Sequence, residues 1–539
     1  MIQPPQIETH TTAQESGEIL SRPPGTDSMR ATVSASLWQV GRGIGWMLLG
    51  VVAARLLNFG YKTAVARLGA EEFGVLALAL MVLGVASWVT SDGLGSSLIR
   101  YVPFYRGRGD LARLRGTILL CLGMNGLLAT LGGILLFLSA PWVAERVFHH
   151  AKLAPLIRVM ACVLPLFNLR AVILRVLIGM GRTDYYVYVY YLCESAVTLL
   201  LTVWLLCIGW GTWGAVVGYA TGLAMSLVFA GWLLEFKTFP IMRGQDHAVF
   251  EGAELLRYAI PLWLIGYADV VHAWADVALL GYLRDARTVG LYSVGVLLAS
   301  VVASIPDMVL PVSSRLVVQH YAQQKIEEAT RIADAVAKWM FVLALPLAGL
   351  VLVCARPIIQ LLFGQEYLPA IQVVSLLVVG KLCWTLSTSA AWMLNMVKRT
   401  RVTLRITIIS TTILVVLNLW LIPSFGAVGA SLATCVALIL HSVITIGCAR
   451  RYVQGGVFPS RGWSIALAGV APLAVGLWMM GRELHHVSTY GLVAVAYLAA
   501  YIALLFALRV FRAEDLAMIQ GLMRLEANGI PVDRRPSRI

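Results

Sequence analysis

Charged residues are scarce in this sequence: Asp, Glu, Lys and Arg together supply 13% of its 539 residues. A soluble domain usually carries about 25% charged residues. Hydrophobic residues supply 59%, and the mean hydropathy is +0.79. These proportions exclude an ordinary soluble domain and are typical of a polytopic membrane protein.

The motifs of common enzymes and ATP-driven pumps are also missing. No GxxxxGK[ST] phosphate-binding loop occurs, because Gly380-Lys381 is followed by leucine. Neither GxSxG nor HExxH is present, and no two aspartates are spaced as DxD, which weighs against a metal-dependent membrane glycosyltransferase. We therefore expect a protein that is not an enzyme and needs no cofactor.

Cysteine is present only as isolated residues. The eight cysteines lie in apolar stretches, and none forms a CxxC pair or a His/Cys group with metal-ligand spacing. Free, buried thiols and no metal site are the expectation.

The formal net charge is +14, which in a soluble chain would suggest binding to nucleic acid. Here the arginines lie in short loops beside apolar segments, so membrane orientation and anionic lipid headgroups explain the charge better. Lysine and arginine gather in alternate loops, as in Arg106 and Arg108 in one and Lys398, Arg399 and Arg401 in another. This alternation predicts that both termini are cytoplasmic.

Apolar runs of spanning length predict an all-α protein of about fourteen transmembrane helices, because about 20 residues cross a bilayer as a helix. In the first half they lie near 43–65, 73–98, 114–138, 155–178, 186–208 and 212–234. In the second half they lie near 255–282, 288–314, 333–353, 366–396, 402–422 and 425–448. Two more follow near 463–481 and 488–509.

Two echoes indicate an internal repeat. The polar turn and apolar run around Gly74 return around Gly290, 216 residues later. TWGAVVGYATGLAMSLV resembles SFGAVGASLATCVALIL, with Gly214 and Gly426 offset by 212. Two motifs at nearly the same offset predict two lobes of like topology, a plan found in transporters. The expected parts are a disordered cytoplasmic tail (1–38), an N-lobe (39–236), a C-lobe (250–450), a final helix pair (460–510) and a second cytoplasmic tail (511–539).

Ionisable residues inside spanning segments are costly and usually face a cavity or a partner. Arg55, Asn58 and Lys62 share one face of the first helix, and Asp269, His272 and Asp276 share one face of the seventh. We interpret these stripes as the lining of an aqueous cavity between the lobes, although direct pairing of the two stripes is an alternative. Asp307, between Pro306 and Pro311, is expected to cap a broken helix. Further buried polar candidates are Asp92, Arg158, Arg170, Glu194, Lys381 and His441.

Five segments stand in order along the chain: VARLGAEEFGVLALAL (65–80), DGLGSSLIRYVPFYRGRGD (92–110), VGLYSVGVLLASVV (289–302), LLFGQEYLPA (361–370) and FGAVGASLATCVAL (425–438). Together they resemble the polysaccharide exporters of the multidrug/oligosaccharidyl-lipid/polysaccharide (MOP) flippase superfamily, over residues 40 to 510. The resemblance implies two six-helix lobes related by a pseudo-twofold axis, plus two extra helices. It also implies transport of undecaprenyl-diphosphate-linked oligosaccharide from the inner to the outer leaflet.

In the same superfamily, flippases of lipid-linked peptidoglycan precursors carry an arginine on the first helix in a serine-arginine-leucine context. Ala54-Arg55-Leu56 is similar, whereas no further cavity arginine of those proteins can be matched here. The resemblance therefore favours a polysaccharide substrate, and Arg55 is the one cation it carries over.

These observations predict a flippase for lipid-linked oligosaccharide in the bacterial inner membrane, serving surface polysaccharide (lipopolysaccharide) synthesis and working by alternating access. Arginine suits a lipid diphosphate because its planar fork matches phosphate oxygens and stays charged when buried. Membrane potential or an ion gradient is the expected energy source. The expected substrate-binding residues are Arg55, Arg170, Lys381 and Asn58, and the ion-coupling candidates are Asp269, Asp276, Asp92 and Glu194.

Membrane lipids are expected partners, together with polysaccharide polymerase and glycosyltransferases as candidates, and no nucleic acid. Two alternatives stay open. A cation or drug exporter of the same superfamily would have an acidic, aromatic cavity without a functional arginine. A non-transporting scaffold for glycan assembly would tolerate neutralisation of the buried charges.

Overall fold

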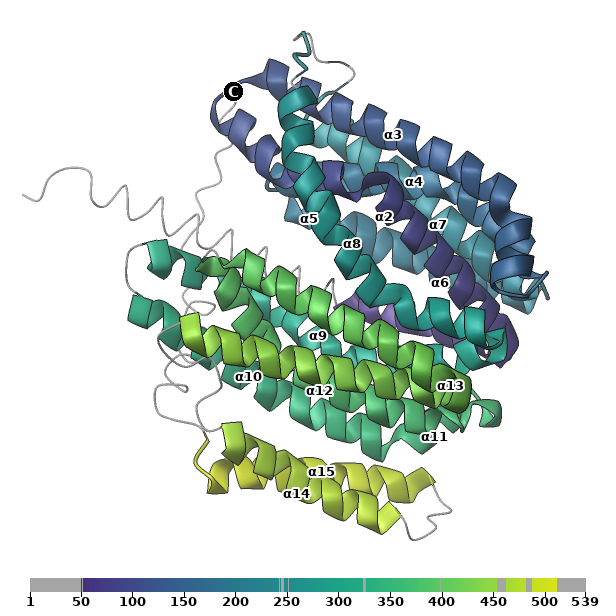
Figure 1. The fold of residues 1–539 in the computed structure, drawn as a ribbon, viewed down its shortest axis with the longest axis vertical. Helices are drawn as coiled ribbons and strands as arrows, with labels where there is room; N and C mark the ends of the chain where they lie inside the picture. The colour runs from purple at the N-terminus through teal and green to yellow at the C-terminus, as the bar shows by residue number, and fades with distance from the viewer. Residues whose placement is uncertain are drawn as a thin grey trace, which may run out of the picture. The chain divides into compact units, whose positions relative to one another are not determined.

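The structure, a computed structural model, describes residue 50 and residues 52–510, apart from 242, 244–246, 251, 323–325, 398, 453–461 and 481–486. These residues are mainly helical and contain no strand (Figure 1). The predicted all-α polytopic fold is therefore confirmed. The two predicted tails lie outside the described residues, as does the predicted start of the first helix near residue 43.

The first half begins with a helix over residues 52–66. It continues with α2 (Ala70–Gly107), α3 (Leu111–Trp142) with the π-helical η1 (Val143–Val147), and α4 (Leu153–Gly179). A composite helix follows, made of α5 (Thr183–Tyr186), the π-helical η2 (Val187–Glu194) and α6 (Ser195–Cys207). The half ends with α7 (Gly211–Leu233) and η3 (Leu234–Thr238).

The second half repeats this order. It contains α8 (Gly252–Leu283), α9 (Ala286–Ala322), α10 (Ile326–Val353), α11 (Ala355–Leu362), η4 (Gln365–Tyr367), α12 (Ala370–Met396) and α13 (Thr400–Tyr452). Two last helices, α14 (Gly462–Met480) and α15 (Val487–Ala507), complete the described chain. Every one of the predicted helical segments is thus occupied, at least in part, by a helix.

Among the described residues, ten helices are long and apolar enough to cross a membrane. One of them, α13, is two spans in one, because Gly426 has the non-helical dihedrals φ 55° and ψ −128° and kinks the chain there. Glycine tolerates this left-handed φ, which other residues rarely adopt. The kink at Gly426 falls at the start of the predicted helix 425–448, just after the predicted helix 402–422, so two helices are confirmed there.

Capping side chains fix the starts of two helices. Asp110 accepts a hydrogen bond from the backbone N–H of Arg113 (3.0 Å) at the start of α3. Asp285 accepts one from the backbone N–H of Thr288 (3.0 Å) at the start of α9. Burial alone would raise the pKa of the Asp285 carboxyl, but the hydrogen bonds from Thr288 outweigh it and hold the pKa below its ordinary value.

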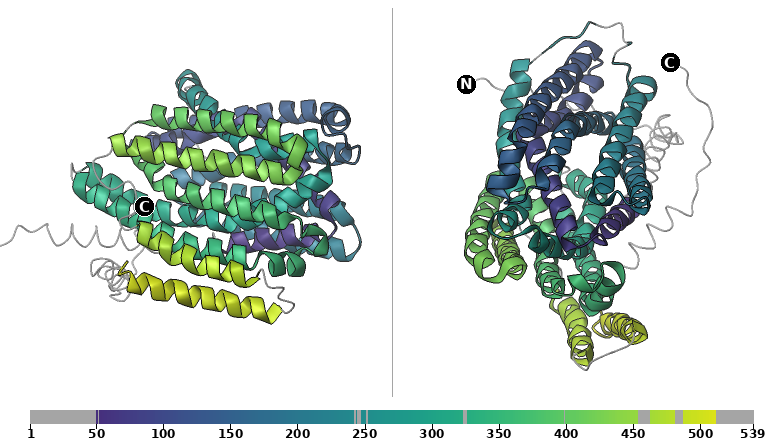
Figure 2. Two further views of the ribbon diagram at one scale, coloured as in Figure 1. Left: turned by 60° about the horizontal axis from the view of Figure 1, so that its bottom comes forward. Right: turned by 90° about the vertical axis from the view of Figure 1, so that its right-hand side faces the viewer.

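The two halves pack together through α2, which contacts α3 and α4 of its own half and α8 and α9 of the other. One hydrophobic core runs through this boundary and includes Leu76 of α2, Leu164 of α4 and Tyr292 of α9. Within the second half, α12 packs against α9, α10 and α13 (Figures 1 and 2).

The last two helices form a separate pair beside the second half (Figure 1). They pack on each other and on α10, where the hydroxyl groups of Tyr497 and Tyr501 donate to the carbonyls of Leu345 (3.4 Å) and Val342 (2.9 Å). This agrees with the prediction of two helices outside the repeat.

Candidate functional site

An ion pair joins the two halves within their membrane-spanning parts. The Arg55 guanidinium, on the helix 52–66, donates from Nη2 to Asp307 Oδ2 of α9 over 2.7 Å. Both side chains are half exposed, at 49% and 51%. The expectation that Asp307 caps a broken helix is wrong, because α9 continues unbroken past it and its carboxylate binds a cation of the other half.

The neighbours of Arg55 are polar and aromatic. Asn58 donates from its side-chain amide to Ser195 Oγ (3.0 Å) and to the carbonyl of Ala54 (3.0 Å), which ties the first helix to α6. Arg55 also interacts electrostatically with Lys62, Tyr190 and Tyr191. The predicted polar face of the first helix therefore borders the aromatic segment η2, which the sequence pattern did not single out.

Arg170 lies deeper in the first half and is already paired. Its guanidinium forms a short ion pair with Glu194, and the two side chains are 4% and 11% exposed. Ser226 Oγ donates to the same carboxylate (3.0 Å), and the guanidinium lies over the rings of Phe167 (4.9 Å) and Tyr190 (5.1 Å). Arg170, a predicted substrate-binding residue, and Glu194, a predicted ion-coupling residue, are thus paired with each other.

Asp276 is buried at the centre of the second half. Its carboxylate accepts hydrogen bonds from Tyr292 (2.5 Å) on α9, and from Asn418 (3.1 Å) and Thr434 (2.9 Å) on either side of the α13 kink. All three hydrogen-bond donors are neutral. These donors were missed from the sequence, although each is a polar residue within an apolar span.

Lys381 of α12 links this acid to the ion pair between the halves. Its ammonium interacts electrostatically with both Asp276 and Asp307, and lies 5.6 Å from the ring of Trp384. Nearby, His272 and His441 contact the hydroxyls of Thr411 (3.2 Å) and Ser410 (3.1 Å).

Asp92 and Asp269 are two further residues that the sequence predicted to belong to the site. The backbones of Asp92 and Asp269 lie in α2 and α8, but their side chains are outside the described part of the structure. The alternative in which the two predicted stripes pair directly is not what the described residues show: Arg55 binds Asp307, and Asp276 binds neutral donors.

One end of the molecule is closed by contacts between the halves. Arg67, just after the first helix, donates to the carbonyls of Leu361 (2.6 Å) and Leu362 (2.9 Å) at the end of α11. Tyr367 donates its hydroxyl to the carbonyl of Ala66 (2.8 Å), and Glu366 accepts from the backbone N–H of Ala70 (3.3 Å). This is the end that the loop charges predict to face the outside.

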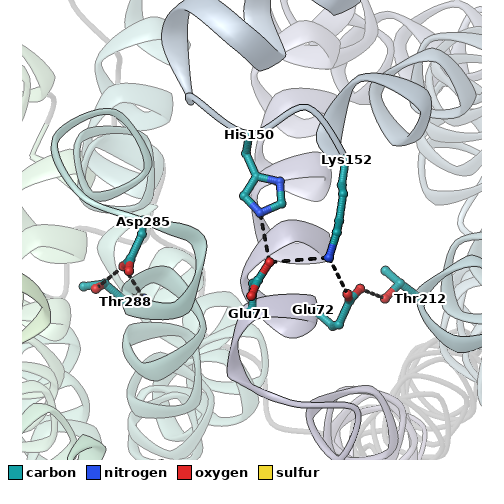
Figure 3. Close-up of polar contacts among 7 residues, drawn as sticks. All are labelled: Glu71, Glu72, His150, Lys152, Thr212, Asp285 and Thr288. Atoms are coloured by element: carbon teal, nitrogen blue, oxygen red, sulfur yellow. Dashed lines mark hydrogen bonds and ion pairs between the residues drawn. The ribbon is translucent and has the colours of Figure 1, made fainter.

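Acidic and basic side chains gather at the same end of the first half (Figure 3). Lys152 lies 3.6 Å from both Glu71 and Glu72, His150 contacts Glu71 (3.2 Å), and Thr212 donates to Glu72. Burial raises the pKa of Tyr367, at the same end, above its ordinary value.

Two pockets repeat the internal symmetry at this end. One, of about 400 Å³, is lined in part by Glu72 and Val75; the other, of about 340 Å³, is lined in part by Thr288 and Leu291. Each pair is separated by 216 residues, the offset of the sequence repeat. Neither pocket is lined by Arg55, so the cavity expected between the lobes stays a prediction.

The cysteines take no part in these clusters. All eight are free, and Cys162 and Cys207 are exposed rather than buried as expected. No group of three or more His, Cys, Asp or Glu side chains that could hold a metal occurs within the described ranges.

Comparisons with known proteins identify relatives of this chain. Residues 64–372 match a family model described as polysaccharide biosynthesis protein, and residues 282–500 match that of the lipid II flippase MurJ. An uncharacterized membrane protein of Methanocaldococcus jannaschii is 21% identical over 87% of this chain and 95% of its own length. The probable flippase AglR of Haloferax volcanii is 28% identical over 36% of this chain and 41% of its own length.

Solved structures show the same fold. The inward closed conformation of the lipid II flippase MurJ has a TM-score of 0.68 at 12% identity, covering 86% of this chain and 99% of that protein. An inward-facing multidrug resistance transporter of the MATE family has a TM-score of 0.62 at 15% identity, covering 74% and 94%. Since the family match spans more than half of the 539 residues, this chain belongs to the polysaccharide biosynthesis protein family of the MOP flippase superfamily.

Proposed function

We propose that this protein is a flippase that moves polyprenyl-diphosphate-linked oligosaccharide from the inner to the outer leaflet of the bacterial inner membrane. The relatives support this proposal, since AglR is a probable flippase and MurJ a lipid II flippase. Membrane lipids, and the polymerase and glycosyltransferases of glycan assembly, are the proposed partners. Both termini are proposed to be cytoplasmic.

The observation that carries the proposal is the half-exposed Arg55 at the boundary between the halves. A lipid diphosphate cannot cross about 30 Å of hydrocarbon without a cation to meet its charge. A guanidinium binds two phosphate oxygens at once and remains protonated. Arg55 belongs to the first half and its ion-pair partner, Asp307, belongs to the second half, so Arg55 contacts both halves.

The proposed mechanism is alternating access, and the contacts between the halves at one end of the molecule support it. The hydrogen bonds of Arg67 and Tyr367 are made between halves, so opening this end requires breaking them. Each half keeps its own internal clusters, Arg170 with Glu194 and Asp276 with Thr434. The halves are therefore proposed to move as bodies against each other.

Asp276 is the proposed ion-coupling acid. A buried carboxylate that receives only neutral hydrogen bonds is costly when charged, so it gains from binding a proton or a cation. Glu194, Asp92 and Asp269 stay further candidates. Lys381 and Asn58 are proposed to support the headgroup site, and Arg170 to act mainly through Glu194.

The test is translocation of a lipid-linked oligosaccharide by the purified protein in liposomes. Arg55→Gln should abolish translocation, while Arg55→Lys should keep part of it because the charge remains. Arg158→Gln is the matched control, since Arg158 is another exposed arginine within a span but lies against Phe137 (5.6 Å) of its own half. Full translocation by Arg55→Gln, or an equal loss in Arg158→Gln, would refute the proposal.

A further inference from the structure

Asp307 is paired with Arg55, the cation that the proposed substrate would bind. Its Oδ2 lies 2.7 Å from Arg55 Nη2, a distance typical of charge-assisted hydrogen bonds from guanidinium to carboxylate or phosphate oxygens. Because both side chains are half exposed, an incoming anion could reach this guanidinium without opening the hydrophobic core.

Asp307 also has a second cation within its own half. Lys381 on α12 interacts electrostatically with Asp307, whereas Arg55 belongs to the first half. If Arg55 is taken by another anion, the charge of Asp307 is still met by Lys381. Asp307 therefore interacts with one cation from each half, through an ion pair with Arg55 and a longer-range electrostatic interaction with Lys381.

We propose that Asp307 is a displaceable counter-ion of Arg55, so that binding of the lipid diphosphate breaks the ion pair between the halves and leaves Asp307 to Lys381. This inference rests on the proposed function of Arg55. It adds a step that the headgroup site alone does not have: the substrate itself releases one bond that joins the halves.

The strength of the pair suits this exchange. An exposed ion pair contributes little net stability, so a diphosphate with a larger charge can displace the carboxylate. An arginine without a partner within the membrane is costly, so Asp307 supplies the counter-charge of Arg55 when no lipid is bound. When the lipid leaves, Asp307 returns to Arg55, which favours release.

The experiment measures equilibrium binding of radiolabelled undecaprenyl diphosphate to the purified full-length protein in detergent. Asp307→Asn should raise the affinity about fivefold, because the competing carboxylate is gone and more of the protein is ready to bind. The same variant should translocate more slowly in liposomes, because no carboxylate at position 307 rebinds Arg55 and displaces the lipid. Asp307→Glu should bind as the wild type does. Asp307→Ser serves the same purpose if Asp307→Asn is not recovered as folded protein.

A double-variant comparison separates displacement from simple repulsion between Asp307 and the diphosphate. In an Arg55→Gln background, displacement predicts that Asp307→Asn no longer changes the affinity. An equal rise in both backgrounds, or no rise in either, would overturn the inference. A wild-type protein that neither binds nor translocates the lipid would instead refute the proposed function, whereas a wild type that does both beside an unchanged Asp307→Asn would refute only this step.

Discussion

Gly74 and Gly290 pack against the backbone of each other's helix. A Cβ on Gly74 would lie 1.7 Å from the carbonyl oxygen of Ala286, and one on Gly290 would lie 1.9 Å from that of Ala70. Both the glycines and the carbonyls are separated by 216 residues, so the two contacts are equivalent under the internal repeat. The contact therefore marks the point at which α2 and α9 meet about the pseudo-twofold axis.

Gly74→Ala and Gly290→Ala should destabilise the protein to a similar extent. Each methyl group would collide with backbone rather than with a flexible side chain, and forced overpacking costs about 1–3 kcal/mol. Thermal unfolding in detergent measures the cost. Gly231→Ala on α7, where no atom lies within 4 Å of the new methyl, is the control and should not destabilise. Strongly unequal effects of the two substitutions would argue against an equivalent contact.

Removing one member of the buried Arg170–Glu194 pair should cost more than removing both. Glu194→Gln leaves the guanidinium buried without its counter-charge, at a cost of about 3–5 kcal/mol. The double variant Arg170→Met/Glu194→Met should be closer to the wild type in thermal stability. If it also translocates lipid, the Arg170–Glu194 pair acts by stabilising the fold; loss of translocation in a stable double variant would place the pair in the transport mechanism.

Asp276→Asn should uncouple transport from the ion gradient. The substitution keeps the shape and much of the hydrogen bonding with Tyr292 and Thr434 but removes the charge. Translocation in liposomes should then no longer respond to an imposed proton or sodium gradient, while binding of undecaprenyl diphosphate persists. Asp334→Asn on α10, outside this cluster, is the control. A gradient response that survives in Asp276→Asn would exclude Asp276 as the coupling acid.

Asp285→Ala should weaken the start of α9 by about 1 kcal/mol, because the N-cap bond to Thr288 is lost. The pKa of Asp285 is below its ordinary value of 3.8, so the carboxylate's contribution is complete above that value and is lost as the pH falls through the lower, folded-state pKa. The difference in Tm between wild type and variant should stay constant between about pH 5 and pH 8 and narrow only in stronger acid. A difference that already closes near neutral pH would contradict this.

The helices were predictable because long apolar runs have one stable outcome in a bilayer. Even the break in α13 was predicted to within a few residues, since the predicted helices 402–422 and 425–448 leave Pro423 and Ser424 between two apolar runs and the kink is at Gly426. The repeat was predictable from Gly74 and Gly290 because close backbone contact leaves no alternative to glycine on either side.

The pairing of the polar residues was not predictable. Helical spacing places Arg55 and Asn58 on one face, but it does not say which element of the other half faces them. Asp307 was misjudged because neighbouring prolines suggested a helix break, whereas α9 passes through Pro306 intact. The partners of Asp276 come from helices 16 to 158 residues away, a relationship that only tertiary packing sets.

The most direct test is the structure of this protein with undecaprenyl diphosphate bound. The account predicts phosphate oxygens about 2.7–2.9 Å from the Arg55 guanidinium, with Asp307 moved away from it toward Lys381. A diphosphate bound elsewhere, with the Arg55–Asp307 pair still intact, would contradict it.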